Sequence, residues 1–258
     1  MCKTILALGK QSPVLSAIVS ELLSAGKNVS IVKYPASRMV TQQSLVSVVM
    51  ADSVKNLVLD NHFEAIFINL YEEPSADEMK LIREVLANIA NRKDIRIAVL
   101  TSVGKSWTGL LNTYRKYDMA FTVFVSSFIF EDLLLLSFKT IIHLSRELIS
   151  GSYGVSARDI GRQIVRAIGR KNQYSGKTYF VYGPEKIDLK EASAKARSQL
   201  LVTEKPSLQV KNLCRALAKI RRVAFFMPNS AKPSGADKTW NELGKPQISF
   251  DGFLKMIA

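Results

Sequence analysis

Short apolar runs alternate with helix-length segments through the first half of the chain. The runs that predict buried strands are Thr4–Leu8, Val29–Val32, Ala65–Asn69, Ile95–Leu100 and Phe121–Val125, and Thr178–Tyr182 follows later. These runs lack strict alternation of apolar and polar residues, which is typical of strands covered on both faces. Strands that alternate with helices form parallel βαβ units, so the pattern predicts an α/β fold with a doubly wound parallel sheet.

Helix boundaries are marked most clearly after the first predicted strand. Ser12 is a suitable N-cap, Pro13 suits the first helical position, and Gly26 follows the predicted helix Pro13–Ser24 as a stop signal. Further helices are predicted at residues 75–91, 156–169, 188–201 and 211–222. The polar, turn-rich stretch Ser230–Asp237 predicts a loop.

The most apolar stretch of the chain does not have the composition of a membrane span. It runs from Phe121 to Leu144 and includes Glu131, Asp132, Lys139 and His143. A span needs about 20 nearly uncharged residues, so this stretch predicts a buried strand and helix instead. The apolar segment Ile5–Leu8 is short and has no small-residue cleavage site, so we expect no secretory signal.

Cysteine and histidine residues are too few for a metal site. Cys2 and Cys214 have no metal-binding or redox spacing, which favours an intracellular, reducing compartment, either the cytoplasm or an organelle interior. His62 and His143 each lack a second ligand at metal spacing, so structural or exposed roles are expected for both.

The positive charge is concentrated in the C-terminal part. Residues 1–150 contain 16 basic and 14 acidic residues, whereas residues 151–258 contain 20 and 8 and so carry +12 of the net +14. We expect residues 1–150 to form the core of the fold. Residues 151–258 would complete the sheet near 178–182 and form a small, mostly helical basic lobe. Charge concentrated in this way suggests an anionic partner.

Basic residues recur at helical spacing in two places. The first series is Arg158, Arg162, Arg166 and Arg170, and the second is Lys211, Arg215, Lys219 and Arg222. Two interpretations remain open: solvated faces with some arginines paired to acids, or a surface for an anionic partner. RNA is the leading partner because guanidinium groups bind phosphates in bidentate fashion, and an acidic protein or anionic lipid is the alternative. Tyr174 and Tyr179 alone do not form a base-stacking platform.

A degenerate phosphate loop follows the first strand and reads Gly9-Lys10-Gln11-Ser12-Pro13-Val14-Leu15. Dinucleotide sites use glycines here for a tight turn, for close approach to the pyrophosphate, and for helix packing. The order of elements and this loop resemble the NmrA-like group of atypical short-chain dehydrogenase/reductases, whose NAD(P)-binding Rossmann fold carries G-x-x-G-x-x-G. Gly9 matches, Ser12 stands at the second glycine, and Leu15 stands at the third. Ser12 is small enough to permit a phosphate, whereas Leu15 would separate helix from strand or fill cofactor space.

The resemblance extends along nearly the whole chain in the same order. The matching segments are Ala51-Asp52, Leu100–Gly104, Val155–Gly161, Gly176–Tyr179, Tyr182–Glu185, Gly244–Pro246 and Ser249–Phe253. They resemble, respectively, the group's Gly-Asp pair, its Ser-Ser-x-Gly strand end, its V-x-x-x-D-I-A helix start, its G-K-x-Y and x-G-P-E segments, and its G-x-P-x-x-F-x-x-F tail. The resemblance implies ancestry and fold more strongly than chemistry.

NADP(H) is the cofactor that the resemblance implies. Lys33 and Arg38 follow the second strand, where a 2′-phosphate is read, although a solvated basic loop explains them equally well. The candidate cofactor residues are Gly9, Lys10, Ser12, Lys33, Arg38 and Asp52, with Lys10 as a phosphate ligand and Asp52 near the adenine. The two replaced glycines leave open whether the cofactor is retained.

Catalytic residues of the classical short-chain type are not evident. That chemistry uses a serine, a tyrosine and a lysine four residues after the tyrosine. The residue four positions after Tyr114 is Asp118, and the residue four positions after Tyr117 is Phe121. Ser102 is the one candidate, and a structural hydroxyl is the alternative. Two functions remain: a non-catalytic scaffold or regulator that docks RNA or an assembly through its basic surface, or an NADP(H)-dependent reductase or redox-responsive regulator.

Overall fold

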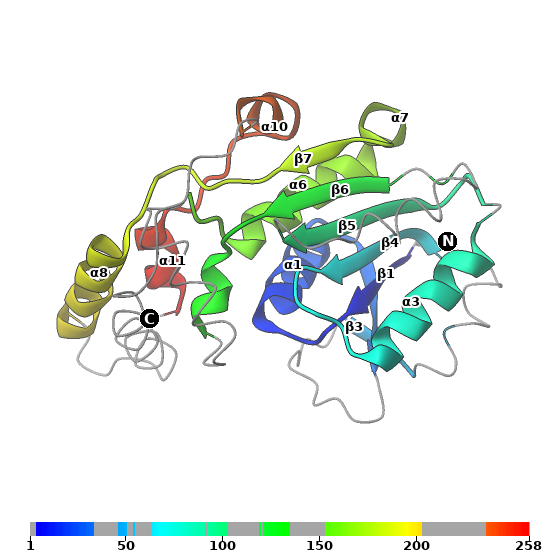
Figure 1. The fold of residues 1–258 in the computed structure, drawn as a ribbon, viewed down its shortest axis with the longest axis horizontal. Coiled ribbons are helices and arrows are strands. Elements are labelled where there is room, and N and C mark those ends of the chain that lie inside the picture. The colour runs from blue at the N-terminus through cyan, green and yellow to red at the C-terminus, as the bar shows by residue number, and fades with distance from the viewer. Residues whose placement is uncertain are drawn as a thin grey trace. The chain divides into compact units, whose positions relative to one another are not determined.

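A computed structural model describes residues 4–33, 46–50, 54, 63–90, 92–102, 119, 121–134, 153–202 and 236–257 (Figure 1). Seven strands form one sheet in the order β3-β2-β1-β4-β5-β6-β7, and every neighbouring pair is parallel. The strands are β1 Thr4–Gly9, β2 Asn28–Lys33, β3 Val46–Met50, β4 Phe63–Leu70, β5 Arg96–Ser102, β6 Phe121–Ser126 and β7 Thr178–Phe180. The predicted doubly wound, Rossmann-type α/β sheet is therefore confirmed.

Helix α1, Pro13–Ser24, forms where its end signals predict it. The Ser12 hydroxyl caps the helix by accepting a hydrogen bond from the Leu15 N–H at 3.2 Å, and Pro13 occupies the first turn. The helix stops before Gly26, whose φ of +72° lies in the left-handed region that glycine tolerates. Its apolar face is buried, so both ends and the packing face agree with the sequence.

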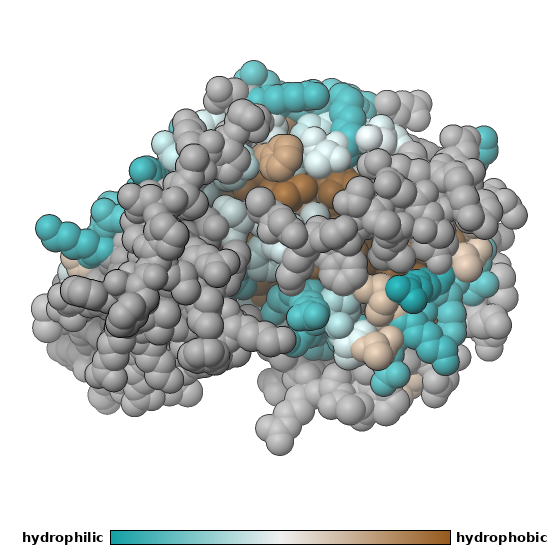
Figure 2. Space-filling view, viewed as in Figure 1, coloured by the Kyte–Doolittle hydropathy of each residue, from teal (hydrophilic) through white to brown (hydrophobic). Residues whose placement is uncertain are grey.

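Helix α3, Ala76–Asn88, begins with a reciprocal cap. The Ser75 hydroxyl accepts from the Glu78 N–H, and the Glu78 carboxylate accepts from the Ser75 N–H at 2.7 Å. Leu81, Ile82 and Val85 face the interior and pack with side chains of the middle strands. Figure 2 shows hydrophobic side chains over the middle of the sheet and mostly hydrophilic described residues around them.

The chain divides into two compact units. The first contains Met1–Ser126 and Gly161–Phe180, and therefore the whole sheet, α1, α3, most of α6 (Ala157–Gly169) and α7 (Lys171–Tyr174). The second contains Ser127–Ile160 and Val181–Ala258. Its described elements are the short 3₁₀ helix η1 (Phe130–Leu134), α8 (Leu189–Val202), α10 (Ala236–Leu243) and α11 (Phe250–Ile257).

The second unit has its own hydrophobic core. Phe130 packs edge-on against Phe128 and Phe250, and tilted against Phe253, with ring centroids 5.3–5.7 Å apart. Ile187, Ala192 and Leu254 complete this cluster. The core of this second unit is built on these aromatic contacts.

One sequence prediction differs from the structure at the C-terminal end. Helix α10 begins at Ala236, so the last two residues of the predicted loop Ser230–Asp237 are helical. The other residues of that loop, and the predicted helix 211–222, lie outside the described residues. No helix among the described residues is long and apolar enough to cross a membrane, and Phe121–Ser126 within the most apolar stretch is strand β6.

Candidate functional site

The loop after β1 lies at the point where the strand order reverses. Strand β1 pairs with β2 on one side and β4 on the other, and Gly9 is in register with Asn69 at the end of β4. Doubly wound sheets bind ligands outside the carboxyl ends of the strands at this position. Gly9, Lys10 and Ser12 therefore lie where the sequence analysis expects a dinucleotide.

Gly9 is required by the geometry of this loop. Its φ is +116°, and a Cβ added to it would lie 2.4 Å from the Asn69 carbonyl oxygen. A side chain at this position would be strained by the backbone and would also collide with β4. The first glycine of the motif therefore retains the role that a tight strand-to-helix turn demands.

Two polar side chains hold the rest of the loop. The Gln11 amide donates to the Val32 carbonyl oxygen at 3.3 Å, which connects the loop to β2. Ser12 is buried and caps α1. The α1 N-terminus thus lies directly after a fixed turn, which is the arrangement that binds phosphates through free backbone N–H groups.

Leu15 does not project from this loop into solvent. Its side chain is fully buried on the same face of α1 as Ile18, Val19 and Leu22. The large side chain at the third glycine position is therefore packed in the interior. Lys10, by contrast, is exposed at the start of the loop, where its ammonium group can reach an anion.

The other predicted cofactor residues are described only in part. Lys33 is the last residue of β2 and is in register with Met50 of β3, so it stands at the carboxyl end of the sheet. Arg38 and Asp52 lie outside the described residues.

Polar residues continue along the carboxyl ends of the neighbouring strands. Asn69 is fully buried at the end of β4, and its side-chain oxygen accepts from the Tyr71 N–H at 3.2 Å. Ser102 ends β5 in register with Ser126, which ends β6, and both are buried. Ser102 thus lies at the carboxyl end of the sheet, as Gly9 does, which is the position expected of either a catalytic or a structural serine in this fold.

A tyrosine–lysine pair at short-chain spacing does occur in the chain, contrary to the sequence analysis. Of the eight tyrosines, Tyr182 alone is followed by a lysine four residues later, Lys186. Tyr182 is buried, Lys186 is exposed, and the residues between them are not helical. A proton-donating pair needs both groups on one helix face, so this pair does not supply that chemistry. Tyr114 and Tyr117 lie outside the described residues.

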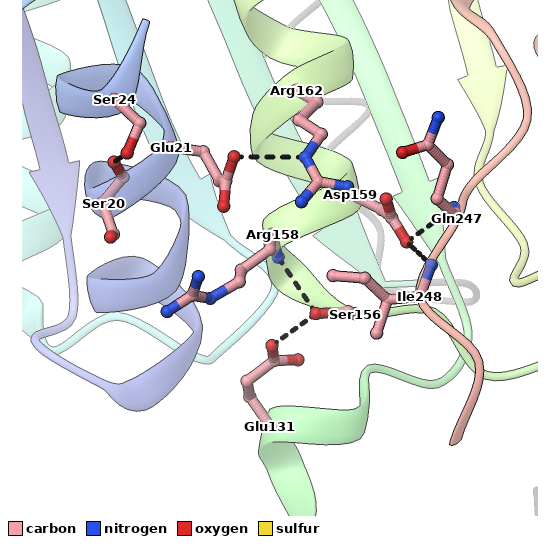
Figure 3. Close-up of polar contacts among 10 residues, drawn as sticks. All are labelled: Ser20, Glu21, Ser24, Glu131, Ser156, Arg158, Asp159, Arg162, Gln247 and Ile248. Carbon is pink, nitrogen blue, oxygen red and sulfur yellow. Dashed lines mark hydrogen bonds and ion pairs between the residues drawn. The ribbon is translucent and has the colours of Figure 1, made fainter. Parts of the chain in front are cut away.

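Helix α6 packs closely on α1 within the first unit (Figure 3). A Cβ on Gly161 would lie 2.8 Å from the Glu21 Cβ, so glycine permits the approach. An ion pair also joins the two helices: the Arg162 Nε donates to the Glu21 carboxylate at 3.2 Å. Arg162 is thus paired with an acid of its own chain, as the interpretation of paired arginines expects.

The other members of the two basic series differ in exposure. Arg166 and Arg170 are exposed near the end of α6, whereas Arg158 is half-buried in its first turn. The series therefore does not present four equivalent guanidinium groups. Residues Lys211, Arg215, Lys219 and Arg222 lie outside the described residues.

The second unit contains a buried carboxylate that the sequence analysis did not single out. Glu131, on η1, accepts a hydrogen bond from the Ser156 hydroxyl at 2.8 Å (Figure 3). It also accepts one from the Ala157 N–H at 2.8 Å. It thereby caps the N-terminus of α6 from a distant part of the chain. Burial raises the pKa of Glu131 to about 7 and outweighs these two hydrogen bonds and the charge of Arg158, all of which lower it.

The C-terminal tail is attached through two further carboxylates. Asp159, which is buried, accepts from the backbone N–H groups of Gln247 and Ile248 at 3.1 and 2.8 Å (Figure 3). Glu185 accepts from the Phe250 N–H, the first residue of α11, at 2.7 Å. Two segments that carry the family resemblance, Val155–Gly161 and Tyr182–Glu185, therefore each contribute an acid that binds the backbone of the C-terminal tail.

No group of three or more histidine, cysteine or acidic residues that could bind a metal ion occurs among the described residues. Cys2, Cys214, His62 and His143 lie outside them.

Comparisons with known proteins give a likeness in structure alone. No protein-family model and no curated protein sequence matches the chain. A nucleoside-diphosphate-sugar epimerase from Pseudomonas aeruginosa has a TM-score of 0.66 and 14% identity, over 100% of this chain and 96% of that one. The Bordetella bronchiseptica enzyme WbmH, solved with NAD⁺, has a TM-score of 0.62 and 13% identity over 98% and 96% of the two chains.

A reductase is among the similar structures. Yeast methylglyoxal/isovaleraldehyde reductase Gre2, complexed with NADPH, has a TM-score of 0.59 and 10% identity over 98% of this chain and 96% of that chain. These matches extend over nearly the full length of both chains in each case. The chain therefore has the Rossmann-type fold of these three proteins.

Proposed function

We propose that this chain binds NADP(H) at the β1–α1 loop and acts as a non-catalytic, NADP(H)-responsive regulator or scaffold. The observation that carries the proposal is Gly9, whose positive φ and contact with Asn69 preserve the turn in front of the α1 N-terminus. Structures of the same fold hold NAD⁺ or NADPH, which supports a dinucleotide as the ligand.

Residues of this loop would hold the cofactor's phosphates. The α1 N-terminus would face the pyrophosphate, and exposed Lys10 would add a positive charge. Lys33, at the end of β2, and Arg38, beyond it, would contact the 2′-phosphate that distinguishes NADP from NAD. Leu15 fits the proposal because it is buried in the helix packing.

The regulatory role is supported by the tyrosine and lysine positions in the sequence. Neither Tyr114 nor Tyr117 has the lysine of a classical proton relay, and the Tyr182–Lys186 pair is split between the interior and the surface. The resemblance to NmrA-like proteins, some of which respond to NADP(H) without that relay, points in the same direction. Ser102, at the edge of the sheet that carries Gly9, favours the second candidate, an NADP(H)-dependent reductase, in which the bound cofactor would supply hydride.

Thermal unfolding with saturating NADPH or NADH tests the proposal. A ligand that binds only the folded state stabilises it by about 3 kcal/mol at 100 times its Kd, so NADPH is expected to raise Tm by several degrees. NADH is expected to raise it less, because it lacks the 2′-phosphate. Equal Tm values with and without both dinucleotides would contradict the proposal. Turnover of NADPH with carbonyl substrates would favour the reductase.

A further inference from the structure

Two basic segments that are far apart in sequence lie at one end of the sheet in the first unit. Residues 92–96 lead into β5, and residues 166–177 include the end of α6, α7 and the approach to β7. Because all strands are parallel, both segments lie at the amino ends, opposite the end that carries Gly9. Figure 1 shows α7 beside the start of β7.

Hydrogen bonds fix the two segments to the sheet and to each other. The Arg96 guanidinium donates to the Ile168 carbonyl oxygen near the end of α6. The Thr122 hydroxyl donates to the Tyr174 carbonyl oxygen at 3.1 Å, and the Lys177 carbonyl oxygen accepts from the Val123 N–H at 2.9 Å. The charged residues on these segments are therefore carried by a rigid scaffold.

The charge of this surface is strongly one-sided. Residues 166–177 contain four basic and no acidic residues, and residues 92–96 contain three basic residues and one acid, which gives a net charge of +6. A helix C-terminus attracts basic residues, which accounts for Arg166 and Arg170 but not for Lys93 or Lys177. We define the amino-end surface as Arg92, Lys93, Arg96, Arg166, Arg170 and Lys177.

We propose that the amino-end surface binds the phosphate backbone of a double-stranded nucleic acid. The Arg92 guanidinium pairs with Asp94 at 2.6 Å, and that of Arg96 donates to Ile168. Bidentate contact with phosphates would therefore fall to the guanidinium groups of Arg166 and Arg170. Lys93, Arg166 and Arg170 are exposed, and so is Gln173, an uncharged hydrogen-bonding side chain on α7. The inference goes beyond the proposed function, which uses the opposite end of the sheet.

The uncharged residues near this surface argue against a single-stranded nucleic acid or a membrane as its partner. Tyr174 and Tyr179 are each only 1% exposed, so neither can stack on the bases of a single strand. The large exposed hydrophobic residues of the described chain are Val48, Met50, Phe180 and Met256, and none belongs to the two basic segments. A surface without apolar anchors is less suited to a membrane than to a regular polyanion.

Fluorescence anisotropy with labelled RNA and DNA duplexes of the same sequence tests this proposal. Both duplexes are expected to bind at low salt. The association constant is expected to fall with at least about the third power of the salt concentration. Arg166→Glu combined with Arg170→Glu is expected to weaken binding about tenfold or more. The matched double variant Lys80→Glu/Arg83→Glu, on exposed positions of α3, is expected to change it less than about twofold.

A second variant protects the test from a folding defect in α6. Lys93→Glu lies in the loop before β5 and should weaken binding without touching that helix. The proposal is overturned by absence of saturable duplex binding, by equal losses in the α3 and α6 variants, or by tighter binding of single-stranded RNA. Polyglutamate could also bind as tightly as the duplexes and lose this binding in the same α6 variant. That result would assign the surface to an acidic protein and would also overturn the proposal. Preference for one duplex over the other would identify RNA or DNA as the source of the phosphates.

Discussion

Replacement of Gly9 by alanine is expected to lower the free energy of unfolding by about 3 kcal/mol. The new Cβ would lie 2.4 Å from the Asn69 carbonyl oxygen, and φ of +116° disfavours any side chain. The obstacle is backbone of the central strand β4, which cannot rotate away as a flexible side chain would. Chemical denaturation followed by circular dichroism measures the loss.

Gly26→Ala is the matched control for this variant. Gly26 also has a positive φ, +72°, but no atom lies within 4 Å of a Cβ built on it. Its replacement is expected to cost about 1 kcal/mol, the backbone contribution alone. Equal losses in the two variants would show that the contact with β4 is not what requires Gly9.

Replacement of Glu131 by glutamine is expected to change the pH dependence of stability. The folded pKa of about 7 lies above the ordinary 4.5, so the folded state binds the proton more tightly than the unfolded state. The stabilisation from this group is fully present below about pH 4.5 and is lost as pH rises through 7. As the pH rises from 5 to 8, the free energy of unfolding of Glu131→Gln is therefore expected to increase by about 2–3 kcal/mol relative to that of the wild type.

Glu131→Ala separates the cap from the charge. Alanine leaves the Ala157 N–H and the Ser156 hydroxyl without the acceptor they now share, whereas glutamine still offers one. At pH 5 we expect the alanine variant to be about 2–4 kcal/mol less stable than the glutamine variant. A difference between wild type and Glu131→Gln that is the same at pH 5 and pH 8 would show that Glu131 does not titrate in this range.

Local signals in the sequence predict the first unit well. Ser12, Pro13 and Gly26 mark the ends of α1, and continuous apolar runs mark six of the seven strands. Strand β3, Val46–Met50, was not predicted because it lies at the edge of the sheet with exposed residues such as Val48 and Met50. It lacks the buried run that identifies the inner strands.

Contacts between distant segments could not be read in the same way. The approach of α6 to α1 at Gly161, the ion pair of Arg162 with Glu21 and the cap by Glu131 each join residues with no shared local pattern. The sequence likewise does not tell which arginines of a regular series are paired and which are exposed. At the candidate site, Gly9 and Ser12 were predicted as parts of the loop, but the burial of Leu15 depends on packing.

Calorimetric titration of NADPH into the wild-type chain and into Lys10→Glu tests the central claim most directly. Lys10 is exposed, so its replacement should leave the fold intact, and Lys80→Glu on α3 is the matched control. We predict saturable one-site binding that is about tenfold weaker in Lys10→Glu and unchanged in Lys80→Glu. Absence of saturable binding, or equal affinity in all three proteins, would contradict a dinucleotide site at the β1–α1 loop.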